Sequence, residues 1–194
     1  MNKEQRAETL YFQKPGPKNT AVCLRAARKR ADELGLESVV LATCSGRTAR
    51  EALEVFDPGR LRLIAVTHVT GFREPNVQEM GSEVREELTS KGILVHTAAH
   101  AFGGVGRGLR QKLSTYQVDE IMAYTLRLFG QGVKVGVEMA LMCADAGLVR
   151  TDREILTIAG TGQGADTALV ITPANSHTCL EARIHEIVAK PRHP

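Results

Sequence analysis

Short apolar segments and longer amphipathic segments alternate along the first half of this chain. The runs at 38–43, 61–67 and 93–98 are short and apolar, which is typical of buried strands. In the intervals around them, apolar residues recur at helical spacing and each pattern ends near a Gly or Pro. The helices predicted on this basis span 20–34, 46–56 and 78–90. The alternation predicts an α/β protein with a parallel, doubly wound sheet.

The second half carries two further helical patterns and two further strands. Helices are predicted over 117–129 and 133–146, on either side of a Gly-Gln-Gly break. Strands are predicted at 155–159 and 168–172. The tail at 183–189 alternates weakly, which is compatible with an edge strand or a helix.

The N-terminal segment has two interpretations. Residues 8–13 (ETLYFQ) look like a protease-cleavage tag, but Lys14 follows where that tag has a small residue. The alternative is a native arm whose Tyr11 and Phe12 pack on the body of the protein. We expect one domain over residues 1–194, with 1–18 as an N-terminal arm.

Composition excludes several classes of protein. The 194 residues are 43% hydrophobic and 24% charged with a net charge of +3, and Lys and Arg are interspersed with acids. Aromatic residues make up 4% and Trp is absent, which argues against a base-stacking platform and a nucleic-acid partner. No apolar run is long enough for a membrane span or a signal core, so we expect a cytoplasmic protein without a membrane partner. The four cysteines form no Cys-x-x-Cys pair, which favours reduced thiols.

The connections that leave the predicted strands differ from those that enter them. The entering connections are short, whereas the leaving connections are rich in Gly, Ser, Thr and His. These polar loops span 43–48, 67–73, 100–104 and 160–166. Because the carboxyl ends of parallel strands share one edge of a sheet, and ligands bind there, we expect a binding site at that edge.

The loop at 43–49 (TCSGRTA) joins a strand to the start of a helix. Small residues leave backbone N–H groups accessible there, and the helix dipole favours an anion. The hydroxyls of Ser45 and Thr48 and the charge of Arg47 strengthen the prediction of a phosphate-binding loop. The alternative is that Ser45 caps the helix while Arg47 is solvated.

The segment 160–164 (GTGQG) is a weaker signal. A dinucleotide fingerprint opens a helix, whereas this segment leads into a predicted strand, so that fingerprint is rejected. A tight turn is one interpretation. The other is a close approach of the backbone to a ligand, with Asp166 and Thr167 as polar contacts.

Candidate catalytic and metal-binding side chains are few. Cys44 and Arg50 match the Cys-x5-Arg loop of cysteine phosphatases, but Thr43 stands where those enzymes usually have His, and an ordinary small residue is the favoured alternative. His68, His96 and His100 do not share a helical face, so no metal site is expected, and contact with a ligand is the favoured role of His68. Lys134 and Glu138 have the spacing of a structural salt bridge, and no catalytic residue is assigned.

Several segments together resemble a known family. The loop Ser45–Ala49 resembles one in the C-terminal domain of pyruvate kinase, where it binds the phosphate of a sugar bisphosphate effector in several of those enzymes. Over nearly the whole chain, the sequence is similar to a stand-alone family of pyruvate kinase C-terminal-domain-like proteins. The segments that carry this similarity are 11–16 (YFQKPG), 67–75 (THVTGFREP), 128–132 (LFGQG), 144–148 (ADAGL), 160–168 (GTGQGADTA), 173–176 (PANS) and 190–192 (KPR).

The resemblance implies a three-layer α/β/α fold with a mostly parallel sheet, a native N-terminus and no kinase barrel. It therefore implies no pyruvate kinase activity. Members of this family look like binders of flavin mononucleotide (FMN), which suits a phosphate-binding loop beside a Gly-rich rim. Cys44 departs from the family pattern, in which Ser or Thr is more usual at that position.

Residues and resemblance together predict a ligand-binding, sensor or flavoprotein role for a phosphorylated small molecule, with FMN as the expected cofactor. The alternatives are a flavin-dependent oxidoreductase and a Cys44 phosphatase. Self-association through the apolar helices at 117–146 is a further expectation, with burial in the core as its alternative. The residues predicted to bind the cofactor are Thr43, Cys44, Ser45, Gly46, Arg47, Thr48, Thr67, His68, Gly71, Phe72, Gly160, Thr161, Gly162, Gly164, Asp166, Thr167 and Asn175.

Overall fold

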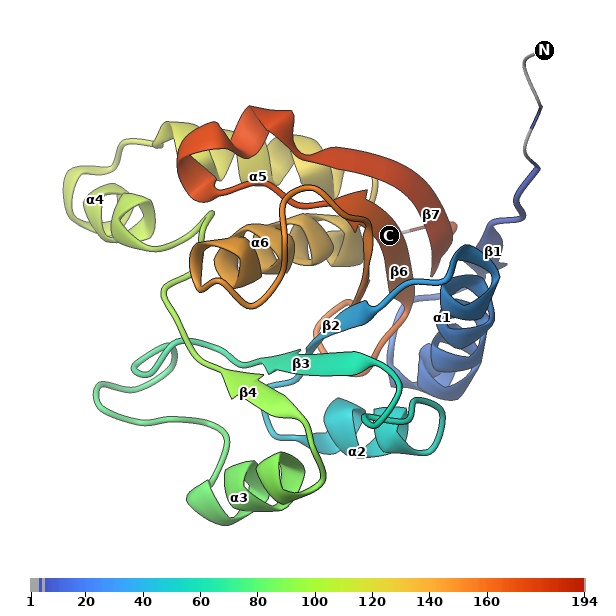
Figure 1. The fold of residues 1–194 in the computed structure, drawn as a ribbon. Helices are drawn as coiled ribbons and strands as arrows, with labels where there is room; N and C mark the ends of the chain where they lie inside the picture. Colours follow the sequence, from blue (N-terminus) through green and yellow to red (C-terminus); the bar gives the residue numbers. More distant parts are fainter. Residues whose placement is uncertain (1–3, 5, 194) are drawn as a thin grey trace.

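A seven-stranded sheet with the order β1-β7-β6-β5-β2-β3-β4 runs through the centre of the protein (Figure 1). A computed structural model describes residues 4 and 6–193. The strands are β1 (Leu10–Phe12), β2 (Ser38–Ala42), β3 (Arg62–Val66), β4 (Leu94–His96), β5 (Ile155–Ala159), β6 (Thr167–Thr172) and β7 (Arg183–Pro191). Strands β2 to β5 pair in parallel, as predicted.

Strand β6 runs in the opposite direction to the other strands. It pairs antiparallel with β5 on one side and with β7 on the other, whereas β1 pairs parallel with β7. The prediction of a mostly parallel sheet is confirmed. The carboxyl end of β6 consequently lies at the opposite edge of the sheet from the carboxyl ends of β2, β3 and β5.

Helices cover both faces of the sheet. Figure 1 shows α1 (Thr20–Leu34), α2 (Arg47–Leu53) and α3 (Ser82–Ser90) on one side. On the other side lie α4 (Val105–Leu113), α5 (Val118–Arg127) and α6 (Gln131–Asp145), and 3₁₀ turns occupy Pro17–Asn19 and Ser176–Glu181. The three-layer α/β/α architecture is therefore confirmed.

Two hydrophobic cores lie on the two faces of the sheet. Along β2, Val39 and Leu41 pack into the core beneath α1, and Val40 packs into the core beneath α6. A strand that is buried on both faces is apolar throughout, which explains the continuous apolar run at this position of the sequence. Helix α6 lies very close to the sheet, since a Cβ on Gly132 would stand 2.2 Å from Thr167 Oγ1.

The Lys134–Glu138 pair on α6 is confirmed, but it lies in the interior of the protein. Lys134 Nζ and Glu138 Oε2 are 2.5 Å apart and both residues are buried. Glu138 Oε1 also accepts a hydrogen bond from the backbone N–H of Phe102 at 2.9 Å. The pair therefore ties the loop after β4 to α6, and both charges have a partner.

Some element boundaries were predicted wrongly. Helix α3 begins at Ser82 rather than at residue 78. The residues between β3 and Ser82 form an irregular loop, in which Gly71 and Asn76 have positive φ. Helix α4 was not predicted, and it contains two glycines, which lower helix propensity.

The N-terminal arm contributes the edge strand of the sheet. Leu10, Tyr11 and Phe12 pair with residues 189–191, so β7 is an inner strand and not the edge strand that was considered. Phe12 is buried in the core with 9% exposure, as expected, whereas Tyr11 is 50% exposed. Within the described part of the chain, no helix is long and apolar enough to cross a membrane.

Candidate functional site

A hollow of about 730 Å³ opens at the carboxyl ends of β2 and β5. Its walls come from the loops after β2, β3 and β5 and from the start of α6, as expected for an edge where parallel strands end. The lining residues are Ala42, Thr43, Cys44, Ser45, Arg47, Thr48, His68, Arg73, Glu79, Gln131, Val135, Gly160, Thr161, Gly162, Gln163 and Gly164. Of these, Ala42, Arg73, Glu79, Gln131, Val135 and Gln163 were not predicted as site residues.

The loop after β2 is held in a fixed shape by its own contacts. The Gly46 N–H donates to Thr43 Oγ1 at 3.1 Å, so this N–H is already paired, whereas the Thr43 hydroxyl keeps its own proton to donate. Gly46 has a φ of 87°, and a Cβ there would stand 2.4 Å from Val84 Cγ1 on α3. Gly is therefore required by backbone conformation and by packing. No side chain caps α2, so the alternative in which Ser45 caps this helix is wrong.

Three side chains of this loop border the hollow. Ser45 is exposed, Thr48 is buried within the lining, and Arg47 is 50% exposed and lies 3.6 Å from Glu51. Arg73 lies on the same wall, where its Nε donates to Glu79 Oε1 at 2.8 Å. Two hydroxyls and two guanidinium groups therefore border one polar cavity, which suits an anionic group.

The loop after β5 needs its glycines for different reasons. A Cβ on Gly160 would meet Gly164 O at 2.2 Å, and a Cβ on Gly164 would meet Pro17 Cα at 2.6 Å. Packing within the protein therefore accounts for both residues. Gly162 has a φ of 77° and open space around it, so its backbone faces the hollow without an obstruction.

Asp166 supports this loop from behind. Its side chain is completely buried and accepts hydrogen bonds from Gly16 N at 3.0 Å, Thr161 N at 3.2 Å and Thr167 Oγ1 at 2.9 Å. Asp166 and Thr167 do not line the hollow. Their predicted contact with a ligand is corrected to a structural role, because their polar groups bond to the arm and to the loop.

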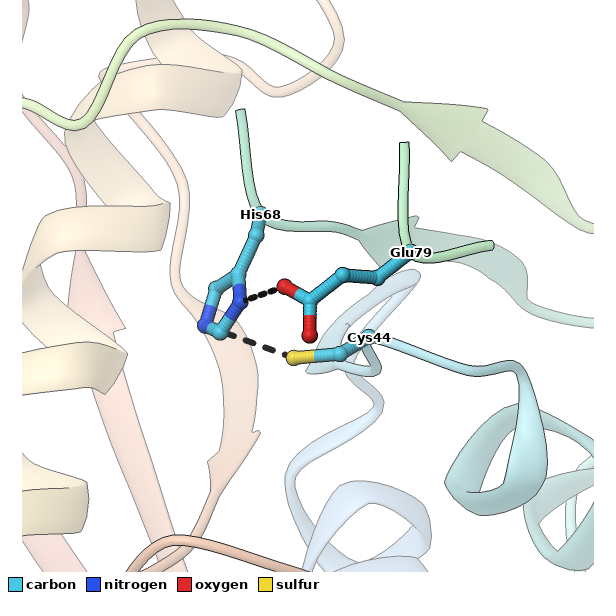
Figure 2. Close-up of side chains that lie close together, drawn as sticks. All are labelled: Cys44, His68 and Glu79. Atoms are coloured by element: carbon cyan, nitrogen blue, oxygen red, sulfur yellow. Dashed lines mark hydrogen bonds and ion pairs between the residues drawn. The ribbon is translucent and has the colours of Figure 1, made fainter. Parts of the chain in front are cut away.

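The side chains of three residues, Cys44, His68 and Glu79, lie close together on one wall of the hollow. Figure 2 shows how they face one another. Cys44 Sγ is 3.3 Å from His68 Nε2, and His68 Nδ1 is 2.5 Å from Glu79 Oε2. Burial, and next the nearby Glu79 charge, raise the pKa of the Cys44 thiol to about 11. The helix-terminal activation considered for a phosphatase is therefore absent at Cys44, which is a neutral thiol at pH 7.

Thr67, Gly71 and Phe72 lie behind His68 and not on the wall of the hollow. Thr67 Oγ1 is buried against Thr97 Oγ1 at 2.6 Å, and Gly71 N donates to Val77 O at 2.9 Å. The ring centroids of Phe72 and His68 are 4.0 Å apart. These predicted site residues instead shape the loop that carries His68.

Asn175 lies at the opposite edge of the sheet. Its Nδ2 donates to Asp145 Oδ1 at 3.1 Å, at the carboxyl end of α6. Asn175 follows β6, and because β6 is antiparallel to its neighbours its carboxyl end points away from the hollow. The prediction that Asn175 belongs to the site is corrected for this reason.

The Cys-x5-Arg loop of a phosphatase does not assemble here. Arg50 Nε donates to Glu87 Oε2 at 3.0 Å, on the outer surface between α2 and α3. Arg50 does not line the hollow that contains Cys44. The guanidinium group that would hold a phosphoryl group over the thiol is therefore directed elsewhere.

Comparisons with known proteins agree with this fold. The family model described as "Pyruvate kinase, alpha/beta domain" matches residues 21–171. The chain belongs to this family. Its resemblance to pyruvate kinase C-terminal domains is thereby confirmed.

One solved structure matches much of this chain at low sequence identity. Cryptosporidium parvum pyruvate kinase in complex with ADP is 13% identical, with a TM-score of 0.38. The match covers 88% of this chain but 23% of that enzyme. The chain therefore spans less than a quarter of the length of that enzyme.

Proposed function

We propose that the hollow at the carboxyl ends of β2 and β5 binds a phosphorylated small molecule. One observation carries this proposal: Thr161 Oγ1 is buried beside the hollow and has no hydrogen-bond partner among the described residues. A buried hydroxyl without a partner costs free energy, and a polar ligand in the hollow removes that cost. The volume of about 730 Å³ lies within the range of small-molecule sites.

The wall formed by the loop after β2 suits the phosphate group. Ser45 and Thr48 offer hydroxyl donors, and Arg47 offers a charge-assisted hydrogen bond. Helix α6, fifteen residues long, begins at the opposite wall with Gln131, where the positive end of its dipole adds to the attraction for an anion. Hydroxyl donors, a guanidinium group and a helix terminus thus act on the same cavity.

Flavin mononucleotide is the specific ligand that we propose. The polar edge of its ring system requires hydrogen-bond partners, which Thr161 Oγ1 and the amides of Gln131 and Gln163 can supply. Val135 and the exposed backbone of Gly162 leave room for a flat ring. This set of donors is the observation that supports FMN as the ligand.

The test is an absorbance spectrum of the freshly purified protein, followed by mass spectrometry of whatever denaturation releases. A flavin spectrum with released FMN supports the proposal. If the protein is colourless, calorimetric titration with FMN and with a phosphorylated metabolite of similar size decides between ligands. Failure to bind either compound contradicts the proposed function. Reduction of bound flavin by a nicotinamide or thiol donor separates an oxidoreductase from a sensor.

Self-association stays a prediction, and the apolar surface of α4 and α5 is the place to test it. Val105, Leu113, Val118, Ile121 and Leu128 are all exposed there. Exposed apolar patches often mark interfaces. Light scattering on the wild type and on an Ile121→Glu variant measures whether this surface joins two copies, and a wild-type monomer contradicts the expectation.

A further inference from the structure

The wall that carries Cys44 has the order of groups that nucleophilic catalysis requires. Cys44 follows β2, His68 follows β3, and Glu79 lies in the loop before α3, so three separate segments bring these side chains together (Figure 2). The thiol contacts one imidazole nitrogen, and the carboxylate contacts the other. A nucleophile thus contacts a base, and that base contacts a carboxylate that can orient it.

The imidazole ring is held firmly in this position. Gln78 Nε2 donates to His68 O at 3.1 Å, and the Phe72 ring packs on the imidazole at 4.0 Å. Arg73 Nε donates to the second carboxylate oxygen of Glu79, which is 16% exposed. Glu79 can therefore accept the Nδ1–H of His68, and that tautomer leaves Nε2 free to take a proton from Cys44 Sγ.

A metal site fits the same residues less well. Their donor atoms lie within 4.8 Å of one another. However, both carboxylate oxygens of Glu79 already have partners, His68 Nδ1 for Oε2 and Arg73 Nε for Oε1. An ion bound by the carboxylate would have to displace one of these partners, so Cys44 and His68 are the residues with free donor atoms. Protein zinc sites use three or four protein ligands.

Phosphoryl transfer also fits less well than transfer of an acyl group. A phosphoryl group over a thiol needs a guanidinium group for its oxygens, and Arg50 is bound to Glu87 outside the hollow. Addition to a carbonyl carbon starts from a thiol whose proton has a base to accept it, and it needs no guanidinium group above the sulfur. The Cys44–His68 contact meets that need.

We propose that Cys44 is the nucleophile of an acyl-transfer site that acts on an activated ester or thioester, with His68 as general base and Glu79 as the positioning residue. The reaction goes beyond the binding of a phosphorylated ligand, although both use the same hollow. The acyl acceptor in the second half of the reaction is water.

The proton and the electron pairs balance at each step. Cys44 Sγ forms a bond to the carbonyl carbon and gives its proton to His68 Nε2. The bond to the leaving group then breaks, and the leaving group takes the electron pair together with the proton from Nε2. Water adds to the thioester with His68 Nε2 as base, the carbon–sulfur bond breaks, and the proton returns to Sγ. The net reaction is hydrolysis of the ester.

The test uses 4-nitrophenyl acetate as the activated ester and follows release of nitrophenolate in the full-length protein. We expect a burst that is stoichiometric with protein, and peptide mapping after an acid quench that places one acetyl group on Cys44. Cys44→Ala should abolish the burst. His68→Gln should slow acylation by about 100-fold or more, the usual contribution of a general base. Cys179→Ser, which removes a half-buried thiol outside the hollow, is the matched control and should keep the full burst.

Three outcomes overturn this proposal. They are no burst in the wild type, an acetyl group on a residue other than Cys44, and an unchanged acylation rate in a folded His68→Gln variant. Turnover of 4-nitrophenyl phosphate that Cys44→Ala abolishes would replace acyl transfer by phosphoryl transfer. Calorimetric titration of the wild-type protein with FMN separates the two proposals, because FMN binding without an acylation burst leaves the proposed function intact and contradicts acyl transfer alone.

Discussion

Each half of the binding rim depends on one carboxylate for its shape, and the two carboxylates have different partners. In the half formed by the loops after β2 and β3, Glu79 contacts a side chain, His68, which in turn contacts Cys44. In the half formed by the loop after β5, Asp166 accepts hydrogen bonds from the backbone of Gly16 and Thr161. In the first half the carboxylate therefore supports side chains that face the hollow, and in the second half the carboxylate holds the backbone of the loop that carries Thr161. A polar, Gly-rich loop at a sheet edge is thus compatible with either role.

Removal of the buried carboxylate should have the largest effect on stability. Asp166→Ala leaves the N–H groups of Gly16 and Thr161 and the hydroxyl of Thr167 without their acceptor in the interior. We expect a loss of about 3–5 kcal/mol in the free energy of unfolding, measured by urea denaturation. Glu79→Gln, which changes the partly exposed carboxylate, should cost less than about 1 kcal/mol. Equal losses of unfolding free energy in the two variants would contradict the different roles that we assign to Asp166 and Glu79.

Alanine substitutions within the loop after β5 sharpen the same contrast. Gly164→Ala combines a positive φ with a contact of 2.6 Å to Pro17, so we expect a loss of about 2–3 kcal/mol. Gly162→Ala has the same type of φ but open space, and about 1 kcal/mol is expected. Thermal unfolding of both variants measures the difference. If Gly162→Ala is the more damaging substitution, the packing explanation for Gly164 is wrong.

Much of the rim could be predicted from sequence because strand ends are marked by polar, Gly-rich connections. The reversed strand was missed although the chain contained a signal for it. Only residues 160–166 separate β5 from β6, and a crossover between parallel strands needs a dozen residues or more. That length predicts a hairpin, and it would have placed Asn175 at the opposite edge.

Glu79 could not be assigned from sequence for a different reason. Residues 78–90 have a helical pattern of charged and apolar positions, which indicates a solvated helix face for Glu79. The helix instead begins at Ser82, and the preceding loop turns Glu79 back onto His68. Gly71 and Asn76 in this loop have positive φ angles. The pattern of apolar and polar positions does not indicate which residues take up such angles.

A substitution in the half of the rim formed by the loops after β2 and β3 should change the affinity for the ligand but not the free energy of unfolding. Arg47 is half exposed, and its contact with Glu51 at 3.6 Å is that of a surface pair. Arg47→Ala should weaken binding of FMN by about 1–2 kcal/mol, the scale of a charge-assisted hydrogen bond. Calorimetry gives the affinity, and the free energy of unfolding should change by less than about 0.5 kcal/mol. Unchanged affinity would remove Arg47 from the site.

The smallest expected effect concerns the protonation of Cys44. Burial and then the Glu79 charge raise its pKa from 9.0 to about 11, with smaller opposing contributions from His68 and Arg73. The thiol is therefore neutral below about pH 9, and alkylation of Cys44 by iodoacetamide should accelerate as pH rises toward 11. Glu79→Gln removes a negative charge that favours the neutral thiol, so the alkylation profile should move to lower pH.

The same Glu79→Gln variant should slow acyl transfer, because an amide orients His68 and stabilises its protonated form less well than a carboxylate does. Alkylation and acyl transfer should thus change in opposite directions, measured by mass spectrometry of the Cys44 peptide in each assay. A merely structural Glu79 would change both rates in the same direction. That result would assign Glu79 to the frame of the rim together with Asp166, and the contrast between the two halves would no longer hold.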